Sequence, residues 1–172
     1  VLRDDLRLVV MSATIDGSRF AALLDQAPVI ESAGKAHPLV IRWLGSRPDV
    51  KLEPAMASAI QTAWREQSGD ILAFLPGVAQ IERTAALLAE RLPQAVVLPL
   101  HGQVEPIGQR AAIRRDPDGR RRIVLATSIA ETSLTLDGVS VVVDAGLSRR
   151  AEFDKAAGVT RLVTTRASQA SA

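Results

Sequence analysis

The chain has 172 residues, of which 47% are hydrophobic and 23% charged, and this composition is typical of a folded globular protein. The absence of cysteine excludes disulfides, thiolate metal sites and a cysteine nucleophile. The net charge is only +2 and aromatic residues make 3%, so bulk charge does not indicate a nucleic-acid partner and a module of stacked aromatic residues is disfavoured.

The first part of the chain is predicted to form short strands around one helix. Short apolar runs predict the strands, and Phe20, Leu23 and Leu24 lie on one face of a helix that Asp16 can cap. Residues 47–51 then resemble a linker. The predicted strands are residues 6–11, 29–31 and 39–44.

From residue 53 onward, helices alternate with strands. The strands are continuous runs of Val, Ile and Leu, as expected when helices cover both faces of a parallel sheet. We therefore predict an α/β fold with right-handed crossovers, followed by an exposed hairpin or strand pair at 151–166. The predicted helices are residues 53–67, 78–92, 106–115 and 129–134, and the predicted strands are 71–75, 95–100, 122–126 and 139–144.

Hydroxyl residues follow two of the predicted strands, at the edge where such sheets bind ligands. Ser12-Ala13-Thr14 either caps the next helix or links a nucleotide site to a neighbouring domain. Thr127 and Ser128 follow a later strand, and Ser128 begins an S-x-x-E capping box. The same helix start presents free N–H groups that can bind phosphate.

Four more polar residues, Thr132, Ser133, Thr135 and Asp137, come within six positions and can bind a ribose or a phosphate. Asp137-Gly138 is equally explained as a turn. Two other strand ends are weaker candidates. Pro76-Gly77 is typical of a structural turn, although Gly77 lets a nucleic-acid backbone approach, and His101-Gly102 shows no metal-ligand spacing.

Five arginines surround the loop at 116–119, and they either form a solvated loop or contact phosphates. Gly34-Lys35 is not part of a phosphate-binding P-loop, because Val29 and Ala36 stand where a glycine and a Ser or Thr are required. No Asp-Glu pair stands at a strand end to hold magnesium. The arginines are Arg114, Arg115, Arg120, Arg121 and Arg122.

Together these segments resemble the DEAH-box helicases of superfamily 2 over nearly the whole chain. The strongest match is LATSIAETSLTLDGV at 125–139, which corresponds to motif V. Within the family the run GRRRIVLAT at 119–127 and the compact tail are most similar to the bacterial HrpB-type RNA helicases. The other matching segments are Ser12-Ala13-Thr14 (motif III), ILAFLPG at 71–77 (motif IV), LPLHG at 98–102 and RASQASA at 166–172, just before motif VI.

The resemblance implies two parts: residues 1–45 would end a first RecA-like domain, and residues 46–172 would form most of a second, truncated before motif VI. It implies a cytoplasmic bacterial enzyme that uses ATP and Mg²⁺ and moves along single-stranded RNA, without a membrane partner. The P-loop and the D-E-x-H motif would precede residue 1, and the arginine finger would follow residue 172. These 172 residues alone would therefore be inactive.

The resemblance also implies roles for single residues. Ser12 and Thr14 would couple ATP hydrolysis to domain movement, and Ser133 would sense the nucleotide state. Thr135 and Asp137 would approach the ATP ribose. Two positions depart from the family: Ser128 replaces a frequent Asn, and Ile113 falls near an adenine-stacking Phe of eukaryotic relatives. The implied nucleic-acid contacts are Gly77, His101, Gly102, Thr127 and Ser128.

Two alternatives stay open at this point. One is a RecA-like domain that binds nucleic acid without catalysis. The other is a superfamily 2 translocase that acts on DNA, which differs from RNA at the 2′-hydroxyl.

Overall fold

The computed structural model describes residues 3, 7, 9–11, 17–31, 37–45, 49–130, 135–155 and 158–167. The chain divides into two compact units, Val1–Gly45 and Ser46–Ala172, and each is described by itself.

The first unit contains the predicted helix, α1 (Gly17–Leu23), whereas its cap Asp16 lies outside the described residues. The predicted strands at 6–11, 29–31 and 39–44 are wrong, because the described residues of these runs form no strand. A strand requires a neighbouring backbone to pair with, and the described part of this unit offers none. The apolar side chains there are accordingly exposed, with Ile30 at 95% and Trp43 at 88%.

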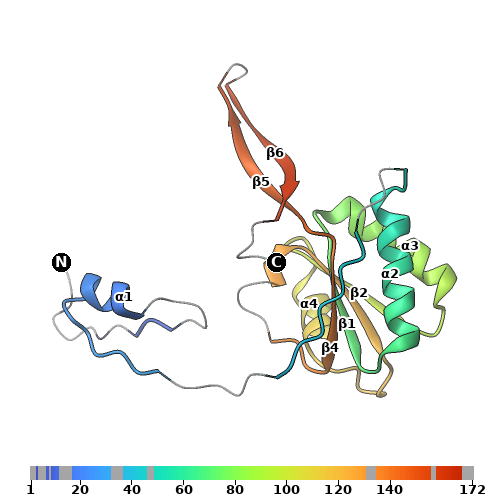
Figure 1. Ribbon diagram of the computed structural model, residues 1–172, viewed down its shortest axis with the longest axis horizontal. Helices are drawn as coiled ribbons and strands as arrows, with labels where there is room; N and C mark the ends of the chain where they lie inside the picture. The colour runs from blue at the N-terminus through green and yellow to red at the C-terminus, as the bar shows by residue number, and fades with distance from the viewer. Residues whose placement is uncertain are drawn as a thin grey trace. The chain divides into compact units, whose positions relative to one another are not determined.

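The second unit is built on a parallel sheet of four strands, in the order β2-β3-β1-β4 (Figure 1). β1 and β3 are central and almost fully buried, which explains their continuous apolar sequences. β2 lies at an edge of the sheet and pairs with a strand on one side only. It therefore tolerates Pro99, which has no main-chain N–H to donate. The strands are β1 (Asp70–Phe74), β2 (Val96–Leu100), β3 (Arg122–Ala126) and β4 (Val139–Asp144).

Helices cover both faces of this sheet, as predicted. α2 (Leu52–Glu66) and α3 (Val78–Arg91) pack on one face, and α4 (Pro106–Ile113) packs on the other (Figure 1). Successive strand residues point to opposite faces. The core therefore has two layers: Ile60, Ile71, Ile81, Leu88, Ile123 and Leu125 in one, and Leu72, Leu100, Ala112, Val124, Ala126 and Ala130 in the other.

The predicted helix at 129–134 is described only in its first turn, the 3₁₀ helix η1 (Ser128–Ala130), since residues 131–134 lie outside the described residues. Among the described residues, no helix is both long and apolar enough to cross a membrane.

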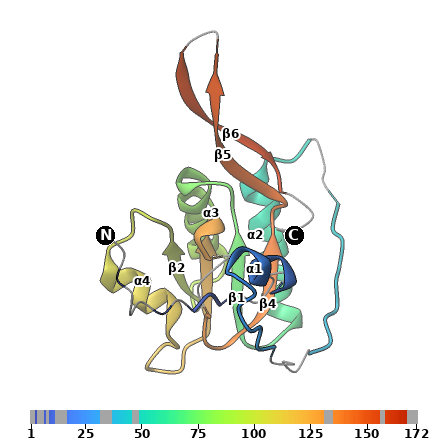
Figure 2. The same cartoon turned by 90° about the vertical axis from the view of Figure 1, so that its left-hand side faces the viewer.

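The predicted hairpin is confirmed and begins four residues earlier than expected. β5 (Leu147–Asp154) pairs antiparallel with β6 (Val159–Arg166), and Leu147 lies opposite Arg166. Only Ala145 and Gly146 separate β4 from β5, and the Gly146 N–H donates to Asp144 Oδ1 at 2.8 Å. The hairpin stands out from the sheet in both views (Figures 1 and 2).

Candidate functional site

The carboxyl ends of the four strands are joined by main-chain hydrogen bonds just beyond the sheet. The Leu75 N–H donates to Ala126 O at 2.8 Å, and the Thr127 N–H donates to Leu100 O at 3.2 Å. The Ala145 N–H donates to Phe74 O at 3.1 Å. The sheet thus gathers at one edge the residues that sequence analysis selected at three strand ends: Gly77, His101, Gly102, Thr127 and Ser128.

This edge carries an open hollow of about 210 Å³, which we call the edge hollow. Three of its lining residues carry hydroxyls and one carries a guanidinium, and such groups suit an anion. A smaller cavity of about 30 Å³ shares four of its residues and adds Asp144, whose Oδ1 accepts the Gly146 N–H. The edge hollow is lined by Leu75, Pro76, Thr127, Ser128, Leu147, Ser148 and Arg149.

Arg149 is a site residue that sequence reasoning missed. Its guanidinium lies against Gly77, so a Cβ added there would be 2.9 Å from Nη1, and its Nε donates to Thr164 Oγ1 at 3.4 Å. Gly77 has an extended φ of −174°, so close approach alone explains the glycine. The space expected for a nucleic-acid backbone beside Gly77 is thus taken by Arg149. The predicted hairpin began at residue 151 and so left Arg149 outside it. A hairpin predicted to begin at Leu147 would have placed Arg149 on its first strand.

The His101 ring is oriented by its own turn. Nδ1 accepts the Gln103 N–H at 3.3 Å, which assigns the ring proton of the neutral form to Nε2. The side chain is half-buried, and nothing lies within 4 Å of a Cβ added to Gly102. The end of β2 therefore offers one ring donor beside an open main chain.

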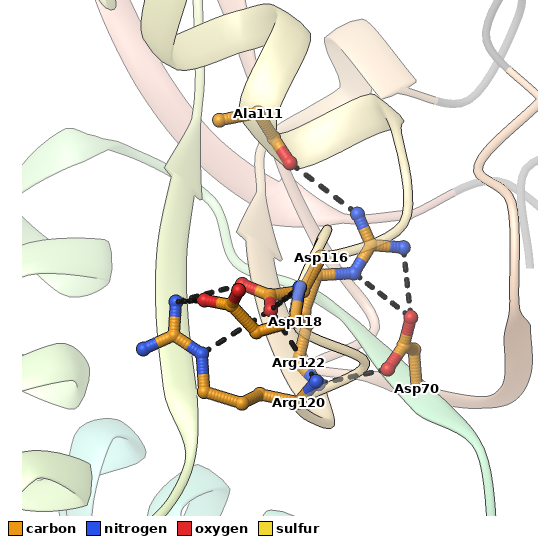
Figure 3. A network of polar contacts seen from close by, with 6 residues as sticks. All are labelled: Asp70, Ala111, Asp116, Asp118, Arg120 and Arg122. Carbon is orange, nitrogen blue, oxygen red and sulfur yellow. Dashed lines mark hydrogen bonds and ion pairs between the residues drawn. The ribbon is translucent and has the colours of Figure 1, made fainter.

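A second polar cluster lies at the opposite, amino-terminal edge of the sheet. The Asp70 carboxylate accepts from Arg122 three times: from the main-chain N–H at 2.7 Å, from Nε at 2.8 Å and from Nη2 at 2.7 Å. Arg122 is completely buried. Figure 3 shows its contacts with Asp70. Its remaining donors reach the main-chain oxygens of Ala111, Ala112 and Asp137.

Asp137 lies at this amino-terminal edge and not beside Thr127 and Ser128. Its carbonyl accepts from Arg122, the first residue of β3, whereas Thr127 follows the last. The Asp137 N–H donates to Ile113 O at 3.2 Å, and the side chains of Thr135 and Asp137 are exposed. The structure therefore brings Asp137 together with Ile113, the position that the resemblance places near the adenine.

Three of the five clustered arginines have structural partners. Arg120 pairs with Asp116 at 3.0 Å and thereby holds the pKa of Asp116 below its ordinary value (Figure 3). The Arg121 guanidinium lies over the Trp64 ring, 4.1 Å from its centroid, and donates to the carbonyls of Trp64 and Gly69. With Arg122 buried as well, the phosphate interpretation is disfavoured for Arg120, Arg121 and Arg122.

Ser12, Thr14, Thr132 and Ser133, as well as Glu131 of the predicted capping box, lie outside the described residues. Within the described ranges, no group of three or more His, Asp or Glu side chains is placed to hold a metal ion.

A family model described as the helicase conserved C-terminal domain matches residues 54–162. The chain belongs to this family. It is 46% identical over 171 residues to the ATP-dependent RNA helicase HrpB of Escherichia coli (strain K12), covering 99% of this chain and 21% of that protein. It is 36% identical over 177 residues to the pre-mRNA-splicing factor ATP-dependent RNA helicase prp22 of Schizosaccharomyces pombe, covering 99% and 15%.

Two solved structures are similar to this chain over 99% of its length. The crystal structure of the E. coli DExH-box NTPase HrpB has a TM-score of 0.84 at 45% identity, covering 99% of this chain and 21% of that one. The crystal structure of the Escherichia coli DEAH/RHA helicase HrpB has a TM-score of 0.88 at 45% identity, covering 99% and 22%. The resemblance to DEAH-box helicases of the HrpB type and the RecA-like fold are confirmed. The chain spans about a fifth of the length of its HrpB relatives.

Proposed function

We propose that this chain is part of an ATP-dependent RNA helicase, in which it holds single-stranded RNA by its backbone and supplies one side of the nucleotide site. The edge hollow is the observation that carries the RNA-binding part. Thr127, Ser128, Ser148 and Arg149, which carry three hydroxyls and a guanidinium, line it at the carboxyl edge of a parallel sheet. Such groups bind phosphate oxygens without selecting a base.

Within this proposal, Thr127, Ser128 and Arg149 contact the RNA phosphates, and His101 donates from Nε2. Gly77 and Gly102 contribute because they have no Cβ atom. At Gly77 the absent Cβ admits the Arg149 guanidinium, and at Gly102 an open main chain can receive the RNA directly.

The nucleotide would bind at the other edge of the sheet. The exposed side chains of Thr135 and Asp137 fit a ribose, and the half-buried Ile113 beside them fits the face of a base. ATP would supply the phosphoanhydride bond whose hydrolysis drives movement, with Mg²⁺ neutralising its phosphates. The other groups would come from a first RecA-like domain of the same protein, of which residues 1–45 form the end. Ser12, Thr14 and Ser133 would couple the two domains.

We also propose a cytoplasmic location.

Two substitutions in the purified protein test the RNA track. Ser128→Ala removes a neutral hydrogen bond, so we expect RNA to bind about 3- to 10-fold more weakly with the same dependence on salt. Arg149→Gln removes one phosphate contact, so the log–log salt slope should become less steep by about 0.7. Fluorescence anisotropy of a labelled poly(U) oligonucleotide, measured across salt concentrations, reports both quantities.

Arg150→Gln is the matched control, because it removes the same charge from the neighbouring residue of β5, whose side chain points to the other face of the hairpin. An equal change of slope in this variant would contradict a phosphate contact at Arg149. Equal affinity for DNA of the same sequence would favour the DNA translocase.

A further inference from the structure

We propose that Arg122, held by Asp70, is a positioning residue for the nucleotide: it fixes the carboxyl end of α4 and the turn at Asp137 relative to one another. The inference rests on the proposed function, which puts ribose contacts at Thr135 and Asp137 and a base contact at Ile113. It adds a buried group that contacts neither ATP nor RNA.

The donors of the Arg122 guanidinium reach two separate segments of the chain. Nη1 donates to the last turn of α4, to Ala111 O at 3.3 Å and Ala112 O at 3.2 Å. Nη2 donates to Asp137 O as well as to the Asp70 carboxylate. One planar guanidinium therefore joins Asp137 to two carbonyls that lie 25 and 26 positions earlier in the sequence, and its rigid geometry constrains their spacing. Figure 3 shows the bonds to Asp70 and Ala111.

The same two segments also contact each other directly. The Asp137 N–H donates to Ile113 O at 3.2 Å, immediately after the two carbonyls that Arg122 holds. A displacement of Asp137 therefore changes its position relative to the end of α4, where the base would lie. Arg122 thus controls the distance between the ribose side and the base side of the proposed nucleotide site.

Asp70 anchors both Arg122 and the turn at Asp137. Its carboxylate accepts three donors from Arg122, while its own N–H donates to Gly138 O at 3.0 Å. Gly138 has a φ of +86°, and a Cβ there would be 3.0 Å from Asp70 Oδ2. The turn thus needs a glycine for its backbone conformation and for its approach to the carboxylate.

Because the Asp70–Arg122 pair is buried, a double replacement can distinguish a positioning role from a contribution to stability alone. A buried ion pair is often replaced by apolar residues with little loss of stability, whereas removal of one partner leaves an unpaired charge. A double replacement, Asp70→Leu with Arg122→Met, keeps the volume and discards the bonds to Ala111, Ala112 and Asp137. If the pair only stabilised the fold, this variant would behave like the parent protein towards ATP.

The test is RNA-stimulated ATP hydrolysis by the whole protein, together with its RNA affinity. We expect the double variant to raise KM for ATP about tenfold with a much smaller change in kcat, because the ground-state geometry of the nucleotide site is lost. Affinity for labelled poly(U) should stay within about twofold, because the edge hollow lies at the opposite end of β3. Arg122→Lys, which keeps the charge but only one donor group, should raise KM by an intermediate factor.

Arg121→Met is the matched control. Arg121 also bonds main-chain oxygens, at Trp64 and Gly69, but its side-chain hydrogen bonds do not reach α4 or Asp137. We expect this variant to lower the melting temperature and leave KM unchanged. An equal rise of KM in Arg121→Met, or an unchanged KM in both Arg122 variants, would overturn the inference.

Asp137→Ala separates failure of the inference from failure of the proposed function. A raised KM in Asp137→Ala alone, with normal Arg122 variants, would overturn only the positioning role. An unchanged KM in Asp137→Ala would overturn the nucleotide contact and the positioning role together.

Discussion

At the scale of single residues, the most informative side chains are two arginines that differ completely in exposure. Arg122 is fully buried, and its charge is matched by Asp70, which lies 52 positions earlier in the chain. Arg149 is exposed and lies across Gly77 at the edge hollow. The sequence placed Arg122 within a cluster of surface candidates and passed over Arg149, because neither partner is a neighbour in sequence.

Gly77→Ala is expected to act through Arg149. The added Cβ would lie 2.9 Å from Nη1 and 3.0 Å from Cζ, so the guanidinium must move, and a flexible exposed side chain can do so with little change in stability. RNA affinity should fall, and the log–log salt slope should become less steep by about 0.7, as for Arg149→Gln. Anisotropy titrations across salt concentrations measure both effects.

The double variant Gly77→Ala/Arg149→Gln provides the control, because two changes that act through one contact are not additive. Its RNA affinity should equal that of Arg149→Gln alone. Additive losses would show that Gly77 contacts the RNA by another route.

At the scale of the elements, α2 and α3 form one layer that two arginines of α3 tie together. Arg83 Nη2 lies 2.7 Å from Glu53 Oε1, and Arg91 Nη1 donates to Ser58 Oγ at 3.1 Å. The hydrogen bond from its own main-chain N–H, followed by the Arg83 guanidinium, lowers the pKa of Glu53, although burial opposes this shift. The contact of Arg83 with Glu53 therefore depends on a group that titrates, whereas the contact of Arg91 with the Ser58 hydroxyl does not.

Arg83→Ala should lower the free energy of unfolding by about 0.2–1 kcal/mol at neutral pH, since Arg83 is largely exposed to solvent. A carboxylate with a lowered pKa stabilises the fold while it is ionised, and this contribution is lost as the pH falls through that pKa. The difference between the variant and the parent protein should therefore shrink below about pH 4. Urea unfolding followed by circular dichroism at several pH values measures it.

Arg91→Ala is the control for this prediction, because Ser58 does not titrate and the destabilisation should not depend on pH in the same range. If both variants showed the same dependence on pH, the Glu53–Arg83 pair would not be its source.

Periodicity predicted the elements well wherever the chain supplies their neighbours. The runs at 71–75 and 122–126 became central strands because helices cover both faces, and the run at 78–92 became α3. The equally apolar run at 39–44 forms no strand, because the described residues of the first unit contain no strand for it to pair with. Apolar sequence therefore predicts the tendency to be buried, while pairing decides whether a strand forms.

At the scale of the whole molecule, the second unit has two polar edges at opposite ends of one sheet. The edge hollow lies at the carboxyl ends of the strands, and the Arg122 network lies at their amino ends. The motif V segment joins the two, since Thr127 follows β3 and Asp137 precedes β4. Residues that appear as one cluster in the sequence are therefore divided between RNA and nucleotide in the proposed function.

The 172 residues by themselves are expected not to hydrolyse ATP. They contain neither a P-loop nor a D-E-x-H motif, and phosphoryl transfer requires the groups that hold the phosphates and the metal ion. A phosphate-release assay with Mg²⁺, ATP and saturating poly(U) checks this expectation. Hydrolysis above the level of a sample lacking protein would contradict it.

The two tryptophans of the chain give each unit its own spectroscopic label. Trp43 in the first unit is 88% exposed, whereas Trp64 on α2 is half-buried under the Arg121 guanidinium. An indole in water emits at longer wavelength than one shielded from it, so the two contributions to the intrinsic fluorescence separate. Changes at the red side of the emission then report events around Trp43, and changes at the blue side report loosening of the sheet domain, without any added dye.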